Sequence, residues 1–166
     1  MATSFIDPAI ARKSKIVDDA LQMVDGWPLP SVVEVSESGT CNRKCAFCPR
    51  SAPDFPDVKE FIAPSLLMKL ANELAAFDYA GIFLFSGFVE PLLDKKIYGH
   101  IAAVRAALPR ARIEMVTNGD VLNEARLERL FAAGLSTLLI SVYDSRAEAD
   151  RFESMCHAVG LQDGQF

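Results

Sequence analysis

Three cysteines lie close together in the segment Cys41-Asn42-Arg43-Lys44-Cys45-Ala46-Phe47-Cys48. Thiolates bind iron and zinc, and three thiolates at spacings of four and three residues can hold three irons of a cubane cluster. The fourth iron of such a cubane stays open to another ligand. The spacing therefore predicts an iron–sulfur site in this segment.

Two other interpretations of the cysteines stay open. A zinc site would take His100, His157 or Cys156 as a fourth ligand, although zinc-binding cysteines usually occur as Cys-x-x-Cys pairs. Alternatively, the three thiols are unrelated structural residues. Cys156 shares the apolar side of a predicted helix with Phe152 and Val159, which is typical of a buried thiol.

Composition places the chain among compact globular proteins. Its 166 residues suit one domain, and 51% of them are hydrophobic while 23% are charged. No apolar run approaches the roughly 20 residues that a membrane helix needs. Charges and Pro8 interrupt the start of the chain where a secretory signal would be apolar, so we expect a cytoplasmic protein with reduced thiols.

Charge argues against a nucleic-acid-binding surface. The formal net charge is −5, and the lysines and arginines are scattered along the sequence. Phosphate binding depends on clustered basic side chains, so no nucleic-acid partner is predicted.

Hydrophobic patterns predict four strand–helix pairs after a short N-terminal helix. The first helix spans 7–24 and is followed by a linker to 30. The strands are expected at 32–35, 81–85, 113–116 and 138–142, and the helices at 64–77, 94–108, 123–133 and 145–159. Strands that are apolar throughout, in strict alternation with helices, are typical of a parallel sheet.

These four units predict an α/β fold, a partial (βα) barrel over 31–166 that follows the N-terminal segment 1–30. A closed eightfold barrel needs about 250 residues, so the barrel is expected to be incomplete, with the edge of the fourth strand unprotected. Helix ends are marked by Asn123 as an N-cap, by Ser145 with Glu148 as a capping box, and by Gly134 and Gly160 at the C-termini.

With its aromatic Phe47, the cysteine segment resembles the radical S-adenosylmethionine (SAM) superfamily. The pattern of that family is Cys-x-x-x-Cys-x-aromatic-Cys after the first strand of a partial barrel. The resemblance implies that Cys41, Cys45 and Cys48 bind a [4Fe–4S] cluster, whose fourth iron is chelated by the methionyl group of SAM. It also implies that Phe47 lies against the adenine.

A second resemblance follows the second strand, in Phe85-Ser86-Gly87-Phe88-Val89-Glu90-Pro91-Leu92. This segment is similar to the Gly-Gly-Glu-Pro motif of the family. The match implies that Glu90 accepts hydrogen bonds from the methionyl ammonium, which is a charge-assisted pairing. Val89 stands where the family commonly has glycine, so the loop is expected to be shaped differently.

Two further motifs stand at the ends of the third and fourth strands. Val116-Thr117-Asn118-Gly119 resembles the segment of radical enzymes that carry a C-terminal SPASM-type auxiliary-cluster domain. Ser141, a polar residue in an apolar strand, is similar to positions that bind the ribose. The resemblance thus adds Asn118 and Ser141 to the residues expected to bind the cofactor.

The resemblance implies a radical SAM enzyme, or its N-terminal portion. Its cluster would cleave SAM to a 5′-deoxyadenosyl radical that abstracts hydrogen from a substrate that no residue here specifies. An external one-electron reductant such as flavodoxin or ferredoxin would be its partner. The alternatives are a catalytically incompetent cluster- or zinc-binding domain of the same ancestry, and an ordinary βα domain with a zinc loop that serves as an interaction module.

Overall fold

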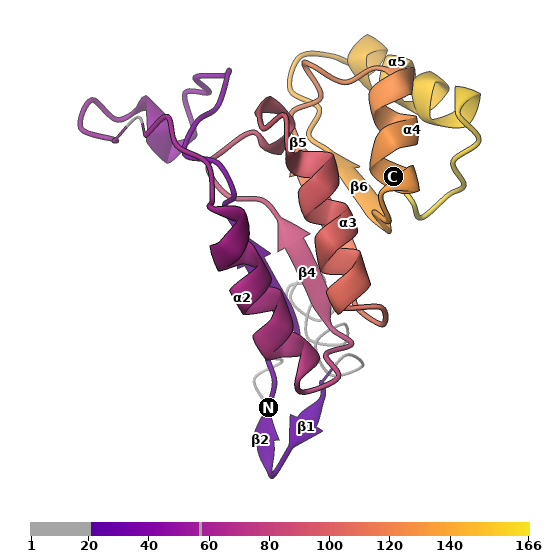
Figure 1. The fold of residues 1–166 in the computed structure, drawn as a ribbon. Helices are drawn as coiled ribbons and strands as arrows, with labels where there is room; N and C mark the ends of the chain where they lie inside the picture. Colours follow the sequence, from indigo (N-terminus) through magenta and orange to yellow (C-terminus); the bar gives the residue numbers. More distant parts are fainter. Residues whose placement is uncertain (1–20, 57) are drawn as a thin grey trace, which may run out of the picture.

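The computed structural model describes residues 21–56 and 58–166. Four strands form one parallel sheet in the order β3-β4-β5-β6, and two very short strands, β1 and β2, form an antiparallel hairpin below the amino ends of these strands (Figure 1). The strands are β1 Met23–Val24, β2 Trp27–Pro28, β3 Val32–Val35, β4 Ile82–Phe85, β5 Arg112–Thr117 and β6 Thr137–Ile140. The helices are α2 Pro64–Ala75, α3 Ile97–Ala107, α4 Glu124–Ala132 and α5 Arg146–Ala158, with 3-10 turns at Pro49–Ser51 and Pro91–Leu93.

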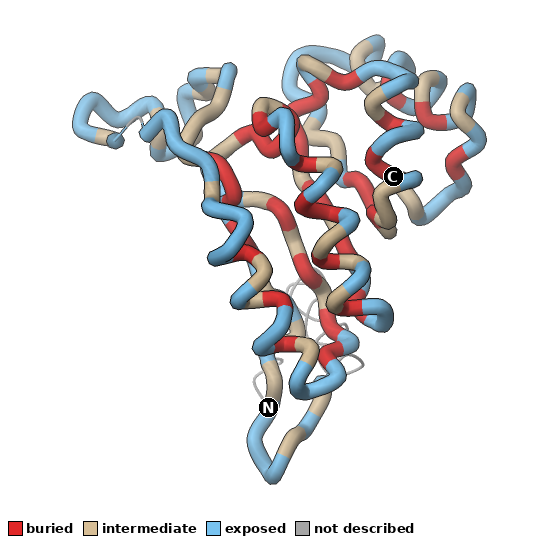
Figure 2. Tube along the Cα trace, in the orientation of Figure 1, coloured by how far each residue is buried: buried red, intermediate tan, exposed pale blue. Residues whose placement is uncertain are grey.

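The four helices form one layer over one face of the sheet. Each helix contacts the next along the chain, α2 with α3, α3 with α4, and α4 with α5. Beneath them, alternate strand residues are fully buried, namely Phe83 and Phe85 in β4, Ile113 and Met115 in β5, and Leu138 in β6 (Figure 2). Helices confined to one face are the arrangement of a barrel wall, whereas a doubly wound sheet carries helices on both faces.

Local signals in the sequence correctly marked where α4 and α5 begin and end, whereas α3 begins at Ile97, three residues after the predicted start, and α2 ends at Ala75, two residues before the predicted end. The Asn123 side chain accepts a hydrogen bond from the backbone N–H of Arg126, and Ser145 accepts one from that of Glu148. Gly134 and Gly160 have φ angles of 105° and 78°, which glycine tolerates without strain. The capping box differs in one respect. The Glu148 carboxylate accepts from the backbone N–H groups of residues 143 and 144 rather than from that of Ser145.

The structure also differs from the predicted boundaries at the N-terminal segment and at β6. The predicted N-terminal helix lies mostly outside the described residues, and its predicted end at 23–24 is wrong, because Met23–Val24 is a strand that pairs with Trp27–Pro28. β6 ends at Ile140, two residues earlier than predicted. Its outer edge is partly covered, because the Leu138 N–H donates to the carbonyl of Gln165 at 2.8 Å.

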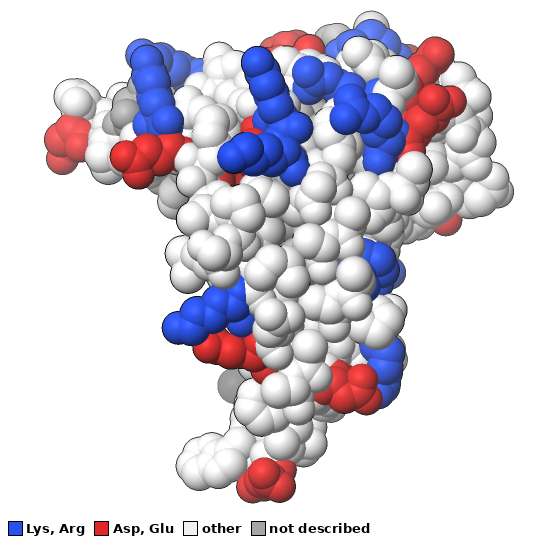
Figure 3. All heavy atoms as spheres, in the orientation of Figure 1, with Lys and Arg blue, Asp and Glu red and all other residues white. Residues whose placement is uncertain are grey.

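Charged side chains are grouped in the fold although they are scattered in the sequence. Figure 3 shows lysines and arginines gathered at the end of the molecule that carries the loops after the strands. In α4, the guanidinium carbon of Arg129 lies 3.9 Å from the centre of the Tyr98 ring, and Arg126 donates to the carbonyl of Leu92 at 3.1 Å. Arg129 therefore joins α4 to α3, and Arg126 joins α4 to the 3-10 turn after β4. Within the described part of the chain, no helix has the length and apolarity to cross a membrane.

Candidate cofactor site

The cysteine loop and the carboxyl ends of the strands surround a cavity of about 230 Å³. Its lining includes every residue that the sequence predicted to bind a metal or a cofactor: Cys41, Cys45, Phe47, Cys48, Glu90, Asn118 and Ser141. These side chains come from the loops after β3, β4, β5 and β6. Because the strands are parallel, their carboxyl ends meet at one end of the sheet, where barrel sites gather.

The two ends of the cysteine loop, which connects β3 to α2, are held together at a narrow neck. There, the Gly39 N–H donates to the carbonyl of Glu60 at 2.9 Å, and the Ile62 N–H donates to that of Glu37 at 2.7 Å. Beyond the neck, the Cys48 N–H donates to the carbonyl of Cys45, which begins a tight turn. The neck therefore holds the base of the loop while its thiols project toward the cavity.

The three cysteines suit an iron–sulfur cluster in which each thiolate binds a different iron. Cys41, Cys45 and Cys48 are half-buried free thiols that line the same cavity. Within residues 21–56 and 58–166, no three His, Cys, Asp or Glu side chains are arranged to hold a single metal ion. A cubane differs from a single ion because each cysteine binds a different iron, so the three thiols need not converge on one point. The residues present thus fit a cubane.

Hydrogen-bond donors are concentrated at one of the three sulfurs. The Cys41 Sγ accepts from the backbone N–H of Arg43 at 3.4 Å and from the Asn118 side-chain amide at 3.8 Å. Hydrogen bonds to the sulfurs help to set the reduction potential of an iron–sulfur cluster. This arrangement gives Asn118 a place beside the cysteines, at the end of β5.

Glu90 is 1% exposed, and its carboxylate is held by three donors. Oε1 accepts from the Thr117 hydroxyl at 2.6 Å and the Leu92 N–H at 3.0 Å, and Oε2 accepts from the Asn118 N–H at 2.8 Å. A carboxylate can accept about four hydrogen bonds, so one acceptor position remains. Burial raises the pKa of Glu90, while the three hydrogen bonds oppose that shift.

The loop that carries Glu90 takes its unusual backbone conformation at Gly87. Gly87 has φ of 121°, and an added Cβ there would lie 2.1 Å from the Ser36 hydroxyl oxygen. Val89 does not have a positive φ, because Asp25 and Asp78 are the only described non-glycine residues that do. The valine in place of the usual glycine is therefore accommodated without backbone strain.

Asn118 connects the end of β5 to the cysteine loop. Its side-chain amide donates to the Asn42 Oδ1 at 2.9 Å, and its Oδ1 accepts from the Asp120 N–H at 3.0 Å. Gly119 follows with φ of 74°, and a Cβ there would lie 2.4 Å from the Phe152 ring. The Asn-Gly turn is thus set by contacts from both sides.

Two aromatic rings meet at the mouth of the cavity. Phe47 is 75% exposed, and its ring stacks on that of Tyr143 with centroids 5.7 Å apart and an interplanar angle of 26°. Tyr143 follows the end of β6, two residues after Ser141, and all three residues line the cavity. The predictions from sequence missed Tyr143, whose signal would have been its place just after a strand end.

The residues considered as a fourth zinc ligand lie elsewhere. Cys156 is fully buried in α5, as expected, and His157 in the same helix packs its ring against Phe166. His100 is buried in α3, with Nδ1 3.3 Å from an Asp94 carboxylate oxygen. The lining of the cysteine cavity includes none of the three.

A buried carboxyl that the sequence did not single out lies at the base of the cysteine loop. Glu37 is 0% exposed, and neither oxygen of its side chain has a hydrogen-bond partner. Loss of hydration raises the pKa of Glu37 to about 8, and the nearby carboxylates of Asp94 and Glu90 add to the shift. This shift favours the protonated form of Glu37 at neutral pH.

Replacing Glu37 by glutamine is expected to change how stability depends on pH. The folded chain holds the Glu37 proton more tightly than the unfolded chain, so folding stability falls as pH rises from about 5 to about 8. The wild type should lose roughly 1 kcal/mol per pH unit relative to Glu37→Gln over this range. Denaturant titrations of both chains at several pH values would measure this difference, and equal slopes would contradict it.

Comparisons with known proteins agree with this geometry. The Radical SAM superfamily model matches residues 35–156. The chain is 33% identical over 132 residues to the S-adenosyl-L-methionine-dependent 2-deoxy-scyllo-inosamine dehydrogenase of Niallia circulans, covering 73% of this chain and 52% of the relative. It is 29% identical over 150 residues to the GTP 3′,8-cyclase of a Synechococcus strain, covering 88% of this chain and 40% of the relative.

Solved structures of BtrN share the fold. The crystal structure of BtrN in complex with AdoMet and 2-DOIA aligns with a TM-score of 0.68 at 28% identity, covering 82% of this chain and 54% of BtrN. BtrN in an open conformation aligns with a TM-score of 0.64 at 32% identity, covering 72% of this chain and 53% of BtrN. The chain thus spans about half the length of these relatives, and its α/β fold is that of a partial barrel.

The cavity at the strand ends, the cysteine pattern and the matched family model cover the same part of the chain. Enzymes of the matched family use a [4Fe–4S] cluster and SAM, and they need a reductant and a substrate. The chain belongs to the radical SAM superfamily.

Proposed function

We propose that this chain provides the cluster- and cofactor-binding part of a radical SAM enzyme. The observation that carries the proposal is the single cavity that joins three free thiols to polar side chains from three neighbouring strand ends. Cys41, Cys45 and Cys48 would hold the [4Fe–4S] cluster as thiolates. When bound and reduced, the cluster supplies one electron that splits SAM into methionine and a 5′-deoxyadenosyl radical, which takes a hydrogen atom from the substrate.

The side chains of this chain bind and orient the cofactor. The acceptor position left on the Glu90 carboxylate suits the methionyl ammonium, because a buried carboxylate is a strong acceptor for a cation. The exposed face of Phe47 suits the adenine, and Ser141, at the end of β6, suits a ribose hydroxyl. Asn118 would hold the end of β5 against the cysteine loop.

The partners follow from the same chemistry. A flavodoxin or ferredoxin is the proposed electron donor, since both deliver single electrons. The named relatives carry out a dehydrogenation and a cyclisation, and both fit an enzyme that begins by abstracting hydrogen. We propose that this chain takes part in the same first step on an organic substrate.

Anaerobic reconstitution of the full chain with ferrous iron and sulfide tests the proposal. We expect about four irons per chain and, after addition of dithionite and SAM, formation of 5′-deoxyadenosine. A cluster without any cleavage of SAM would favour the catalytically incompetent domain of the same ancestry. Zinc in the anaerobic preparation, with no cluster after reconstitution, would favour the zinc-loop interaction module.

A further inference from the structure

Arg43 lies between two of the cysteines, and carboxylates from distant parts of the chain surround it. Its Nε donates to the Asp120 Oδ2 at 2.8 Å, and its Nη2 pairs with the Asp120 Oδ1 at 2.5 Å. The same Nη2 lies 3.3 Å from an Asp144 oxygen and 3.4 Å from a Glu148 oxygen. One guanidinium therefore joins the cysteine loop to the ends of β5 and β6.

The Arg43–Asp120 ion pair differs from an ordinary surface pair in its burial and in the number of its hydrogen bonds. The side chains of Arg43 and Asp120 are 18% and 29% exposed, and the guanidinium meets the carboxylate through two parallel bonds. Forked arginine–carboxylate contacts are stronger and more directional than single ones. By contrast, the Arg146 and Asp150 side chains, which pair within α5, are 85% and 56% exposed, and such pairs contribute little.

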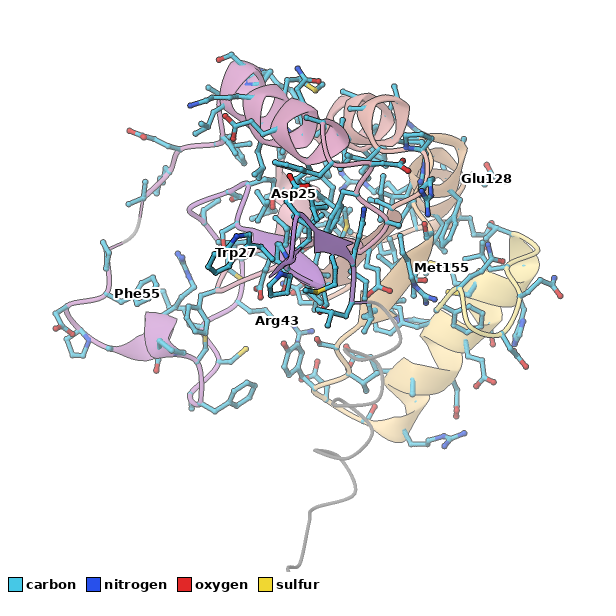
Figure 4. The ribbon with its side chains drawn as sticks, turned by 90° about the horizontal axis from the view of Figure 1, so that it is seen from below. Asp25, Trp27, Arg43, Phe55, Glu128 and Met155 are labelled. Atoms are coloured by element: carbon cyan, nitrogen blue, oxygen red, sulfur yellow. The ribbon has the colours of Figure 1, made fainter. Side chains whose placement is uncertain are left out.

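A second set of contacts extends from Arg43 to the aromatic pair. Its guanidinium carbon lies 4.9 Å from the centre of the Tyr143 ring, which itself stacks on Phe47. Glu148 accepts from the backbone N–H groups of Tyr143 and Asp144, so the segment that carries the ring is held as well. In Figure 4, Arg43 lies on the side of the cysteine loop that faces α5, whereas Phe55 lies at the far end of the loop.

We propose that Arg43 is a positioning residue that locks the cysteine loop onto the ends of β5 and β6 before the cluster binds. This inference rests on the proposed function in that the thiols are taken as cluster ligands. Residues that orient metal ligands from outside lower the cost of ordering a site, and their loss usually weakens metal binding. Asn42 supports the same contact, because its amide donates to the Asp120 Oδ2 at 2.8 Å.

The apo chain tests this inference without any cluster. In Arg43→Gln the loop should open, so Cys41, Cys45 and Cys48 should react several-fold faster with a thiol reagent than in the wild type. Cys156, buried in α5, is the internal reference, because its labelling reports unfolding of the fold rather than opening of the loop. Asp120→Asn should give the same result, and Arg43→Lys should recover only part of the protection, since lysine lacks the fork.

Cluster retention provides the second readout. After reconstitution, Arg43→Gln should lose iron to a chelator roughly tenfold faster than the wild type. Arg146→Gln, which removes the exposed pair in α5, should match the wild type in both measurements. Unchanged thiol reactivity and iron loss in Arg43→Gln would overturn the inference. If the wild type binds no cluster at all, the proposed function fails, whereas the thiol measurement still tests the lock.

Discussion

Cys45→Ala is expected to abolish cluster binding. Bound iron should fall from about four per chain to fewer than about one, and no 5′-deoxyadenosine should form. The physical reason is that each of the three thiolates holds a different iron, and the side chains that line the cavity include no other cysteine that could replace one. Iron analysis and the absorbance of the reconstituted chain measure the loss.

Cys156→Ala is the matched control for this experiment. Cys156 is buried in α5, and burial raises the pKa of its thiol, so it is a poor ligand where it lies. This variant should retain both the cluster and SAM cleavage. A Cys45→Ala chain that still bound a full cluster, or a Cys156→Ala chain that bound none, would contradict the assignment of the ligands.

Glu90→Gln is expected to weaken SAM binding roughly ten- to hundredfold. A hydrogen bond between a charged donor and a buried carboxylate contributes about 1.5–3 kcal/mol, and the neutral amide loses that charge. The amide NH2 would also face at least one of the donors that Glu90 now accepts from, because both carboxylate oxygens are occupied. Equilibrium dialysis of SAM against the reconstituted variant measures the change.

The control for this variant is Glu128→Gln. Glu128 is exposed on the outer side of α4, whereas Glu90 is buried. That control should bind SAM as the wild type does. Because burial raises the pKa of Glu90, wild-type affinity should also weaken as pH falls and the carboxylate takes up a proton, while Glu90→Gln should show no such step. Equal affinities of Glu90→Gln and the wild type would mean that Glu90 only fastens the loop to β5.

Neighbouring residues determine most of the fold, which is why the sequence revealed it. The apolar run of β4 and the N-caps Asn123 and Ser145 depend on residues a few positions apart, and each is where the sequence predicted it. The sequence pattern wrongly extended the N-terminal helix to residue 24, because Met23–Val24 is a strand. The hairpin of Met23–Val24 with Trp27–Pro28 depends on Asp25 and Gly26 taking positive φ, a turn that the helical pattern hid.

The candidate site could likewise be predicted only in part from the sequence. Because the strands are parallel, motifs that follow successive strands must meet at one end of the sheet, so the sequence alone could collect Cys41, Glu90 and Ser141 into one place. It could not assign their partners. The three donors that hold Glu90 include two from the end of β5, more than 25 positions away in the chain.

Arg43 shows most clearly what only the tertiary structure decided. From the sequence it was a charged loop residue, and its carboxylate partners lie 77, 101 and 105 positions away. Ion pairs of this kind depend on loop conformations rather than on local patterns, and a single sequence carries no sign of which acid a given arginine will meet. The sequence therefore determined which chemistry this protein carries, through the cysteines and their neighbours. The fold decided which side chains hold that chemistry in place, because only packing brings the ends of separate strands within reach of one guanidinium.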